Sequence, residues 1–134
     1  MASIDGVEGI GYKQATKLRK ARIRTTEALL KAGATKKGRR TIAASSDISE
    51  KLILEWVNRA DLMRVRGVGE EYSDLLEAAG VDTVKELRRR NAGSLLGMMV
   101  SINTKRRLVR RLPTEMMVAR WVDHAKELPP VVTY

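Results

Sequence analysis

The chain has 134 residues, of which 26 are Lys or Arg and 16 are Asp or Glu, so its formal net charge is +10. It has no cysteine, which excludes disulfide bonds and thiolate metal ligands. No apolar stretch approaches the length of about 20 residues that a membrane-spanning helix needs, and no signal peptide is visible. We therefore expect a cytoplasmic protein without a membrane partner.

The positive charge is concentrated in one part of the sequence. Residues 11–40 hold eleven Lys or Arg residues and one acidic residue, Glu27, so this stretch alone carries a net charge of +10. The charges of all other residues sum to zero. Net charge reports on partners and not on fold, and such segregation favours a polyanion-binding face in the first half of the chain.

Helix starts in the first half are predicted from Ser and Thr residues, which can cap the free amides of a first turn. Helix ends are predicted from glycine, and helical spacing of apolar residues makes Trp56 a core anchor. The expected elements are a turn or short helix over residues 1–11, a helix over 12–21, a short helix from Thr25 or Thr26 to Ala32, a basic link over 34–40 that opens a helix to about Ser45, and a helix over 50–63 capped by Ser49.

The helix limits of the second half are predicted from the same signals, and Thr83 and Glu86 are predicted to form a capping box. The expected elements are a helix over 70–79, a helix after Thr83, a short buried helix over 92–102, a helix from Pro113 or Thr114 to about Leu128, and an extended tail over 131–134. We expect core positions for Met98, Met99, Met116, Met117 and Trp121, and an exposed His124. No β-sheet is predicted, so the expected fold class is all-α.

Parts of the sequence occur twice. Val7-Glu8-Gly9-Ile10-Gly11 returns 58 residues later as Val65-Arg66-Gly67-Val68-Gly69, and the stretch around Trp56 returns 65 residues later around Trp121. The sequence therefore predicts two repeats, a strongly basic one over residues 1–61 and a second one over residues 62–134 that includes the tail. We expect the repeats to pack with pseudo-two-fold symmetry around one core.

Each copy has a glycine-apolar-glycine turn before a predicted helix. Glycine adopts positive φ cheaply, and the free amides and positive dipole of a helix N-terminus attract anions. With its apolar spacing, the pattern resembles the helix-hairpin-helix motif, whose family role is to hold DNA by its phosphates without reading bases. The whole chain, and residues 49–62 in particular, is also similar to an uncharacterised bacterial family, the domain of unknown function numbered four-three-three-two. This resemblance implies the architecture and no established role.

The first hairpin is the expected phosphate site. Its glycines leave backbone N–H donors accessible, and lysines follow in the first turns of the next helix. Arg22 is interpreted either as a tolerated helix cap or as a phosphate contact, and the basic link either as solvated or as a contact loop. The candidate nucleic-acid-binding residues are Gly9, Ile10, Gly11, Tyr12, Lys13, Lys17, Arg22, Lys36, Lys37, Arg39 and Arg40.

The second hairpin, Gly67-Val68-Gly69, is expected to be structural. Glu70 and Glu71 occupy the first turn of the helix that follows it. Acidic side chains there satisfy the helix dipole and repel a phosphate. Arg64 and Arg66 precede the turn and compensate in part. In paired helix-hairpin-helix proteins the two hairpins commonly grip opposite DNA strands, and the acidic second hairpin departs from that pattern.

Two classes of function fit these patterns. The leading hypothesis is sequence-independent binding of double-stranded DNA through backbone phosphates. The alternative is a protein-interaction or assembly module with purely structural hairpins, whose basic face meets an acidic protein or RNA. An enzyme is not expected, because the one histidine, His124, has no partners in a nucleophilic or metal-binding arrangement. We expect no cofactor and no metal.

Overall fold

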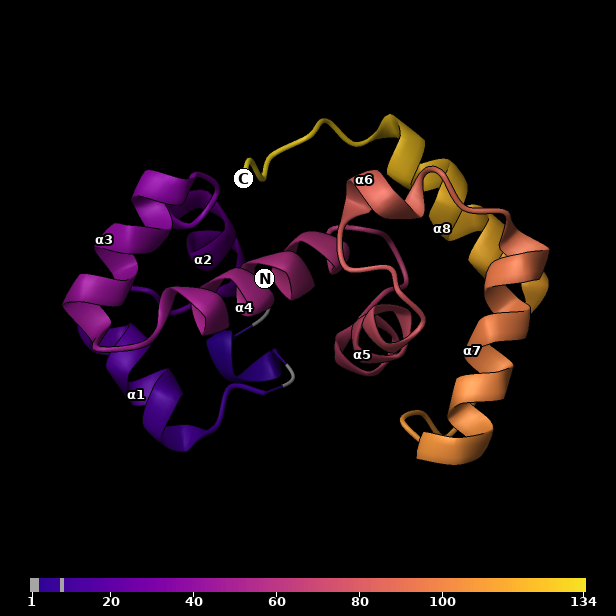
Figure 1. The fold of residues 1–134 in the computed structure, drawn as a ribbon, viewed down its shortest axis with the longest axis horizontal. Helices are drawn as coiled ribbons and strands as arrows, with labels where there is room; N and C mark the ends of the chain where they lie inside the picture. The colour runs from indigo at the N-terminus through magenta and orange to yellow at the C-terminus, as the bar shows by residue number, and fades with distance from the viewer. Residues whose placement is uncertain (1–2, 8) are drawn as a thin grey trace. The chain divides into compact units, whose positions relative to one another are not determined.

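The computed structural model describes residues 3–7 and 9–134. Met1, Ala2 and Glu8, the last of which belongs to the first hairpin motif, lie outside the described residues. Within this part of the chain all regular elements are helices (Figure 1), and an isolated bridge pairs Ser3 with Thr25. The all-α prediction is thus confirmed. The elements are η1 (Ile4–Gly6), α1 (Tyr12–Lys20), α2 (Thr26–Ala32), α3 (Lys36–Ser46), α4 (Glu50–Leu62), α5 (Glu70–Ala78), α6 (Val84–Leu87), α7 (Ala92–Arg106) and α8 (Glu115–Glu127).

The chain divides into two compact units. The first unit contains residues 1–61 and 131–134, and the second unit contains residues 62–130. The division after residue 61 lies at the boundary that the sequence predicts. The tail differs from the prediction, because residues 131–134 pack with the first unit and not with the second.

Threonine side chains begin several helices, as predicted. The hydroxyl of Thr25 accepts a hydrogen bond from the Ala28 amide at 3.0 Å, and that of Thr114 accepts one from the Met117 amide at 3.1 Å. Thr83 caps α6 in the same way, since its hydroxyl accepts from the Glu86 amide at 3.1 Å. These caps satisfy amides that have no partner inside the helix, which is why the predicted starts agree with the observed ones.

The basic link expected over residues 34–40 is largely helical. Helix α3 begins at Lys36, because the hydroxyl of Thr35 accepts from the Gly38 amide at 3.0 Å and caps the first turn. A side chain at Gly38 would collide with the backbone carbonyl of Ala32. The glycine therefore lets α3 pack closely on the end of α2, and it does not interrupt the helix.

The core of the second unit is made by apolar side chains from all of its helices, with Trp121, Leu95 and Met99 almost fully buried. Helix α7 is longer than the predicted helix over 92–102, and its side chains are not uniformly buried. Met98 is 44% exposed and Met116 is 65% exposed, so the expectation that these two methionines fill the core is wrong. Among the described residues, no helix is both long and apolar enough to span a membrane.

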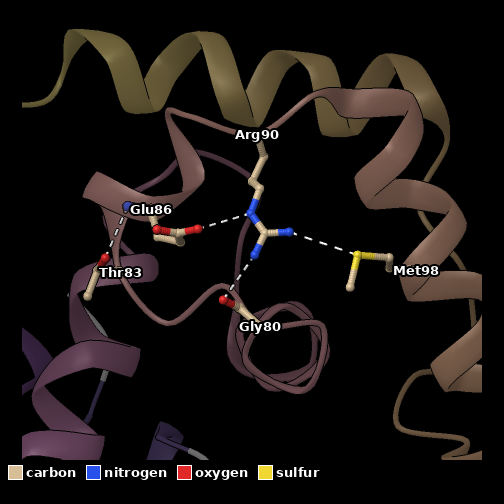
Figure 2. A network of polar contacts seen from close by, with 5 residues as sticks. All are labelled: Gly80, Thr83, Glu86, Arg90 and Met98. Carbon is tan, nitrogen blue, oxygen red and sulfur yellow. Dashed lines mark hydrogen bonds and ion pairs between the residues drawn. The ribbon is translucent and has the colours of Figure 1, made fainter.

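Arg90 joins three segments of the second unit (Figure 2). Its guanidinium donates to the Glu86 carboxylate at 3.1 Å and to the Gly80 carbonyl at 3.2 Å, and it contacts the sulfur of Met98 at 3.9 Å. The Glu86 carboxylate thus pairs with Arg90 one helical turn away. The capping box predicted for Thr83 and Glu86 is confirmed for its threonine half, described above.

Candidate nucleic-acid interface

Gly9 shapes the first hairpin. Its φ angle is +92°, and a Cβ at this position would lie 3.4 Å from Nε1 of Trp56. Positive φ favours glycine because other residues are strained there. Trp56 is buried, with 2% of its surface exposed, as expected for a core anchor. The sequence did not indicate that its indole lies against the hairpin glycine.

Gly11 opens helix α1. It is the N-cap residue, with φ −80° and ψ 177°, and its carbonyl accepts the amide of Ala15 at 2.9 Å. Among the described residues, a Cβ at Gly11 would meet no atom within 4 Å apart from its chain neighbours, so the space on that side of the N-cap is open. Ile10, the residue before Gly11, is 6% exposed. Its side chain is therefore buried, and this candidate residue can contact a ligand only through its backbone. The N-cap residue, Gly11, provides no side-chain hydrogen bond to the first-turn amides of α1.

The side chains of the first turns of α1 differ in accessibility. Tyr12 is 84% exposed and Lys13 is also exposed. Lys17 is half-buried, and its ammonium donates to the Asp47 carbonyl at 3.4 Å. Lys13 is therefore the most accessible cation next to Gly11.

Arg19 lies on the same helix, but its charge is offset locally. Its guanidinium pairs with the carboxylate of Asp5 at 3.4 Å. A hydrogen bond from the Ser3 hydroxyl, together with the charge of Arg19, lowers the pKa of Asp5 from its usual value. Asp5 is therefore ionised at neutral pH and offsets part of the positive charge of Arg19.

Three further candidate cations are exposed at the start of α3: Lys36, Lys37 and Arg40. Arg40 faces the carboxylate of Glu50 at 3.5 Å, and both side chains of this pair are more than half exposed. Exposed pairs of this kind are weak, so Arg40 can exchange its partner for a phosphate. Arg22 is also exposed, and it has φ +66° at the end of α1.

Arg39 is not at the surface, in contrast to the expected phosphate contact. It is 5% exposed. Its guanidinium donates to the carbonyls of Gly33 at 2.9 Å, Ala34 at 3.2 Å and Thr133 at 2.8 Å. It also lies over the ring of Tyr134, 5.8 Å from the centroid. Arg39 therefore has a structural role, and we exclude it from the interface proposed below.

The extended tail is the element that buries Arg39. The amide of Thr133 donates to the Ala34 carbonyl at 2.8 Å, and the hydroxyl of Tyr134 contacts the amide oxygen of Asn58 at 2.9 Å. Asn58 is buried, so the tail completes polar groups that would otherwise lack these partners. No local sequence signal connects Arg39 with residues more than ninety positions later.

Replacing Arg39 with Met should lower the free energy of unfolding by about 1–3 kcal/mol, because three backbone carbonyls lose a charged donor. The apolar part of the side chain is retained. Arg40→Met is the matched control and should change stability by less than about 0.5 kcal/mol. Urea unfolding measures both effects. Equal stability of the two variants would contradict the structural role of Arg39.

The second hairpin has related geometry with a different charge. Gly67 has φ +92°, and a Cβ there would lie 3.0 Å from Nε1 of Trp121. Gly69 is the N-cap of α5, and Glu70 and Glu71 lie in its first turn. Carboxylates in a first turn interact favourably with the helix dipole and repel a phosphate, so this hairpin is a poorer phosphate site than the first one.

His124 also contributes to the second hairpin. Its Nδ1 accepts the backbone amide of Arg66 at 2.9 Å. The ring is half-buried, so the expected exposed position is only partly correct. The histidine connects α8 to the turn before Gly67.

A family model described as Domain of unknown function (DUF4332) matches residues 8–128. The chain belongs to this family. No curated protein and no solved structure matches the chain. The DUF4332 match includes both glycine hairpins and every candidate nucleic-acid-binding residue, whereas the tail that covers Arg39 lies beyond it. The description of DUF4332 assigns no activity.

Proposed function

We propose that this DUF4332 chain binds double-stranded DNA without sequence preference, through backbone phosphates at the first glycine hairpin. The observation that carries the proposal is the open N-terminus of α1. In the described part of the chain, no side chain caps the helix at Gly11, and a Cβ on this residue would meet no atom within 4 Å apart from its chain neighbours. Amides of this kind, at the positive end of a helix dipole, bind phosphate oxygens.

The positive charge around the hairpin supports the same partner. Lys13 is exposed next to the open amides. Residues 11–40 carry a net charge of +10, although Arg39 is buried and Arg19 pairs with Asp5. Phosphate contacts supply affinity and orientation but no sequence information, so binding should be independent of sequence. The side chains proposed for the interface are Tyr12, Lys13, Lys17, Arg22, Lys36, Lys37 and Arg40.

We further propose that the two units are helix-hairpin-helix repeats, of which only the first binds DNA. The recurrence of backbone hydrogen bonds 58 residues apart supports this interpretation. The first unit has a three-residue 3-10 helix, η1, before its hairpin. Before the hairpin helix, the amide of Ile10 donates to the Val7 carbonyl (3.1 Å), and the amide of Val68 donates to the Val65 carbonyl (3.0 Å). At the start of the helix, the amides of Ala15 and Ser73 donate to the carbonyls of Gly11 and Gly69 (both 2.9 Å). After the helix, the amides of Ile23 and Val81 donate to the carbonyls of Leu18 (2.9 Å) and Leu76 (2.8 Å).

Charge reversal at the hairpin tests the proposal. Lys13→Glu/Lys17→Glu should weaken binding to any duplex at least about tenfold, and the slope of log affinity against log salt should become shallower by about 2, because two phosphate contacts are lost. Lys51→Glu/Lys85→Glu is a control that changes net charge equally at exposed lysines outside the interface. Fluorescence anisotropy with random-sequence duplexes measures both. Equal loss in the two variants would mean that the first hairpin is not the binding site.

A protein-interaction module is the second candidate function. The observation that favours it is the exposure of large apolar side chains in the second unit, among them Met98, Leu112 and Met116. Exposed apolar surface is common at binding sites for proteins. Absence of DNA binding at physiological salt, with loss of a protein partner on Met116→Lys, would favour this function over DNA binding.

A further inference from the structure

A cavity of about 470 Å³ lies within the first unit, at the C-terminal end of α1, whereas the hairpin site is at the N-terminal end of this helix. It is bounded by the turn after α1, by one face of α2 and by one face of α3. Its volume is within the range of about 300–1,000 Å³ that is usual for ligand sites. We call it the α2–α3 groove. The groove is distinct from the open amides at Gly11, because neither Gly11 nor Lys13 lines it.

The lining of the groove combines two cations with small side chains. Arg22 and Lys37 contribute the charge, and Ala28, Ala32 and Gly38 contribute apolar surface. No Asp or Glu of the described residues lines the groove. The described hydrogen bonds and ion pairs leave the guanidinium of Arg22 and the ammonium of Lys37 without a partner. Both cations are therefore available to an anion.

Two of the groove's hydroxyls are already used as donors, and the third, that of Thr35, accepts the Gly38 amide at 3.0 Å. Thr41 donates to the Lys37 carbonyl at 3.1 Å, and Ser45 donates to the Thr41 carbonyl at 3.0 Å. The charged donors for a ligand are thus Arg22 and Lys37. A ligand that fits presents anionic oxygens to these side chains and apolar atoms to the alanines. The sugar–phosphate backbone has both features, since phosphates alternate with the apolar faces of sugars.

The backbone conformation of Arg22 adds a second observation at the groove. Its φ of +66° lies in the left-handed region, which is unfavourable for residues with a Cβ. The residue that corresponds to Arg22 in the second unit is Gly80, which follows α5 and has φ +92°. Its carbonyl accepts a hydrogen bond from Arg90 (Figure 2). Strained residues persist where function favours them. Asp47 and Arg107 also have positive φ, so the position of Arg22 at the groove is what distinguishes it.

We infer that the α2–α3 groove is a second contact for the DNA backbone, which extends the hairpin site and rests on the proposed function. Arg22 and Lys37 each neutralise one phosphate in this arrangement. Arg22 is then kept in place of glycine for binding and at a cost in stability. Measuring the stability and the DNA binding of an Arg22 variant therefore decides whether this residue is a tolerated cap or a contact.

The test compares Arg22→Gly with Arg107→Gly. Both variants remove one positive charge and relieve the same type of backbone strain, but only Arg22 lines the groove. For Arg22→Gly we expect an unchanged or higher melting temperature, about tenfold weaker binding to a labelled random-sequence duplex, and a salt slope shallower by about 0.9. Arg107→Gly should bind as the unchanged protein does.

Lys37→Gln is a second variant that does not alter backbone strain, and it should show a similar loss. If Arg22→Gly and Lys37→Gln both bind as tightly as Arg107→Gly, the groove is not a contact. If they do so while Lys13→Glu/Lys17→Glu loses affinity, only the groove is rejected and the hairpin site stands. If the unchanged protein binds no duplex at physiological salt, the groove and the proposed function are rejected together.

Discussion

Gly67→Ala is expected to lower the free energy of unfolding by about 2 kcal/mol, since the left-handed conformation costs a residue with a Cβ about 1–2 kcal/mol and the new methyl group also crowds the indole of Trp121. The φ angle of Gly67 is +92°, and the added Cβ would lie 3.0 Å from the indole nitrogen. Trp121 is 2% exposed and cannot move aside without disturbing the core. Chemical denaturation of the full chain measures the loss.

Gly9→Ala and Gly97→Ala calibrate this result. At Gly9 the same φ is combined with a looser distance of 3.4 Å to Trp56, so the loss should be smaller, about 1–2 kcal/mol from backbone strain alone. Gly97 lies inside α7 with nothing within 4 Å of its added Cβ, and Gly97→Ala should stabilise the protein by about 0.5–1 kcal/mol. If Gly67→Ala is as stable as the unchanged protein, the close approach of Trp121 to the hairpin is incorrect.

Gly11→Asp is expected to weaken DNA binding about ten- to hundredfold, because a hydrogen bond to a charged group contributes about 1.5–3 kcal/mol. The backbone of Gly11 is already extended, with φ −80° and ψ 177°, which suits a side-chain cap. The new carboxylate would accept the first-turn amides and occupy the place of the phosphate. Asp is also a better N-cap than Gly, so stability should be unchanged or higher by a few tenths of a kcal/mol.

Gly69→Asp is the matched control in the second hairpin. Gly69 is likewise an N-cap with open space around its Cβ position, so this variant gains the same cap and the same negative charge. It should bind DNA nearly as well as the unchanged protein, because Glu70 and Glu71 already exclude a phosphate. Anisotropy titrations together with thermal unfolding separate the two effects. Full retention of DNA affinity by Gly11→Asp would contradict phosphate binding at the α1 N-terminus.

The helices could be predicted largely because their start signals are local. Thr25, Thr83 and Thr114 cap the amides of residues three positions later, so each signal lies within one helical turn. The limits of α3 and α7 were harder to predict. From the sequence alone, Gly38 indicates a break in the helix. Its role is to allow close packing on Ala32, and only the tertiary structure reveals that contact.

The candidate site could be predicted in part for the same reason. The geometry of Gly9, Ile10 and Gly11 follows from adjacent residues, whereas the burial of Arg39 depends on Thr133, which is 94 positions away. The exposure of Met98 and Met116 depends on which face of each helix meets the core. A basic residue in a cluster is therefore a weak prediction of a contact until its long-range partners are known.

Binding of the unchanged protein to random-sequence duplex DNA across a salt series tests phosphate-mediated binding most directly. If about five phosphates are neutralised, the slope of log affinity against log salt should be about −4 to −5. Dissociation constants should be micromolar or lower at moderate salt, and a scrambled duplex should compete equally. Absence of binding at physiological salt, or a strong preference for one sequence, would contradict it and assign the glycine hairpins to the fold alone.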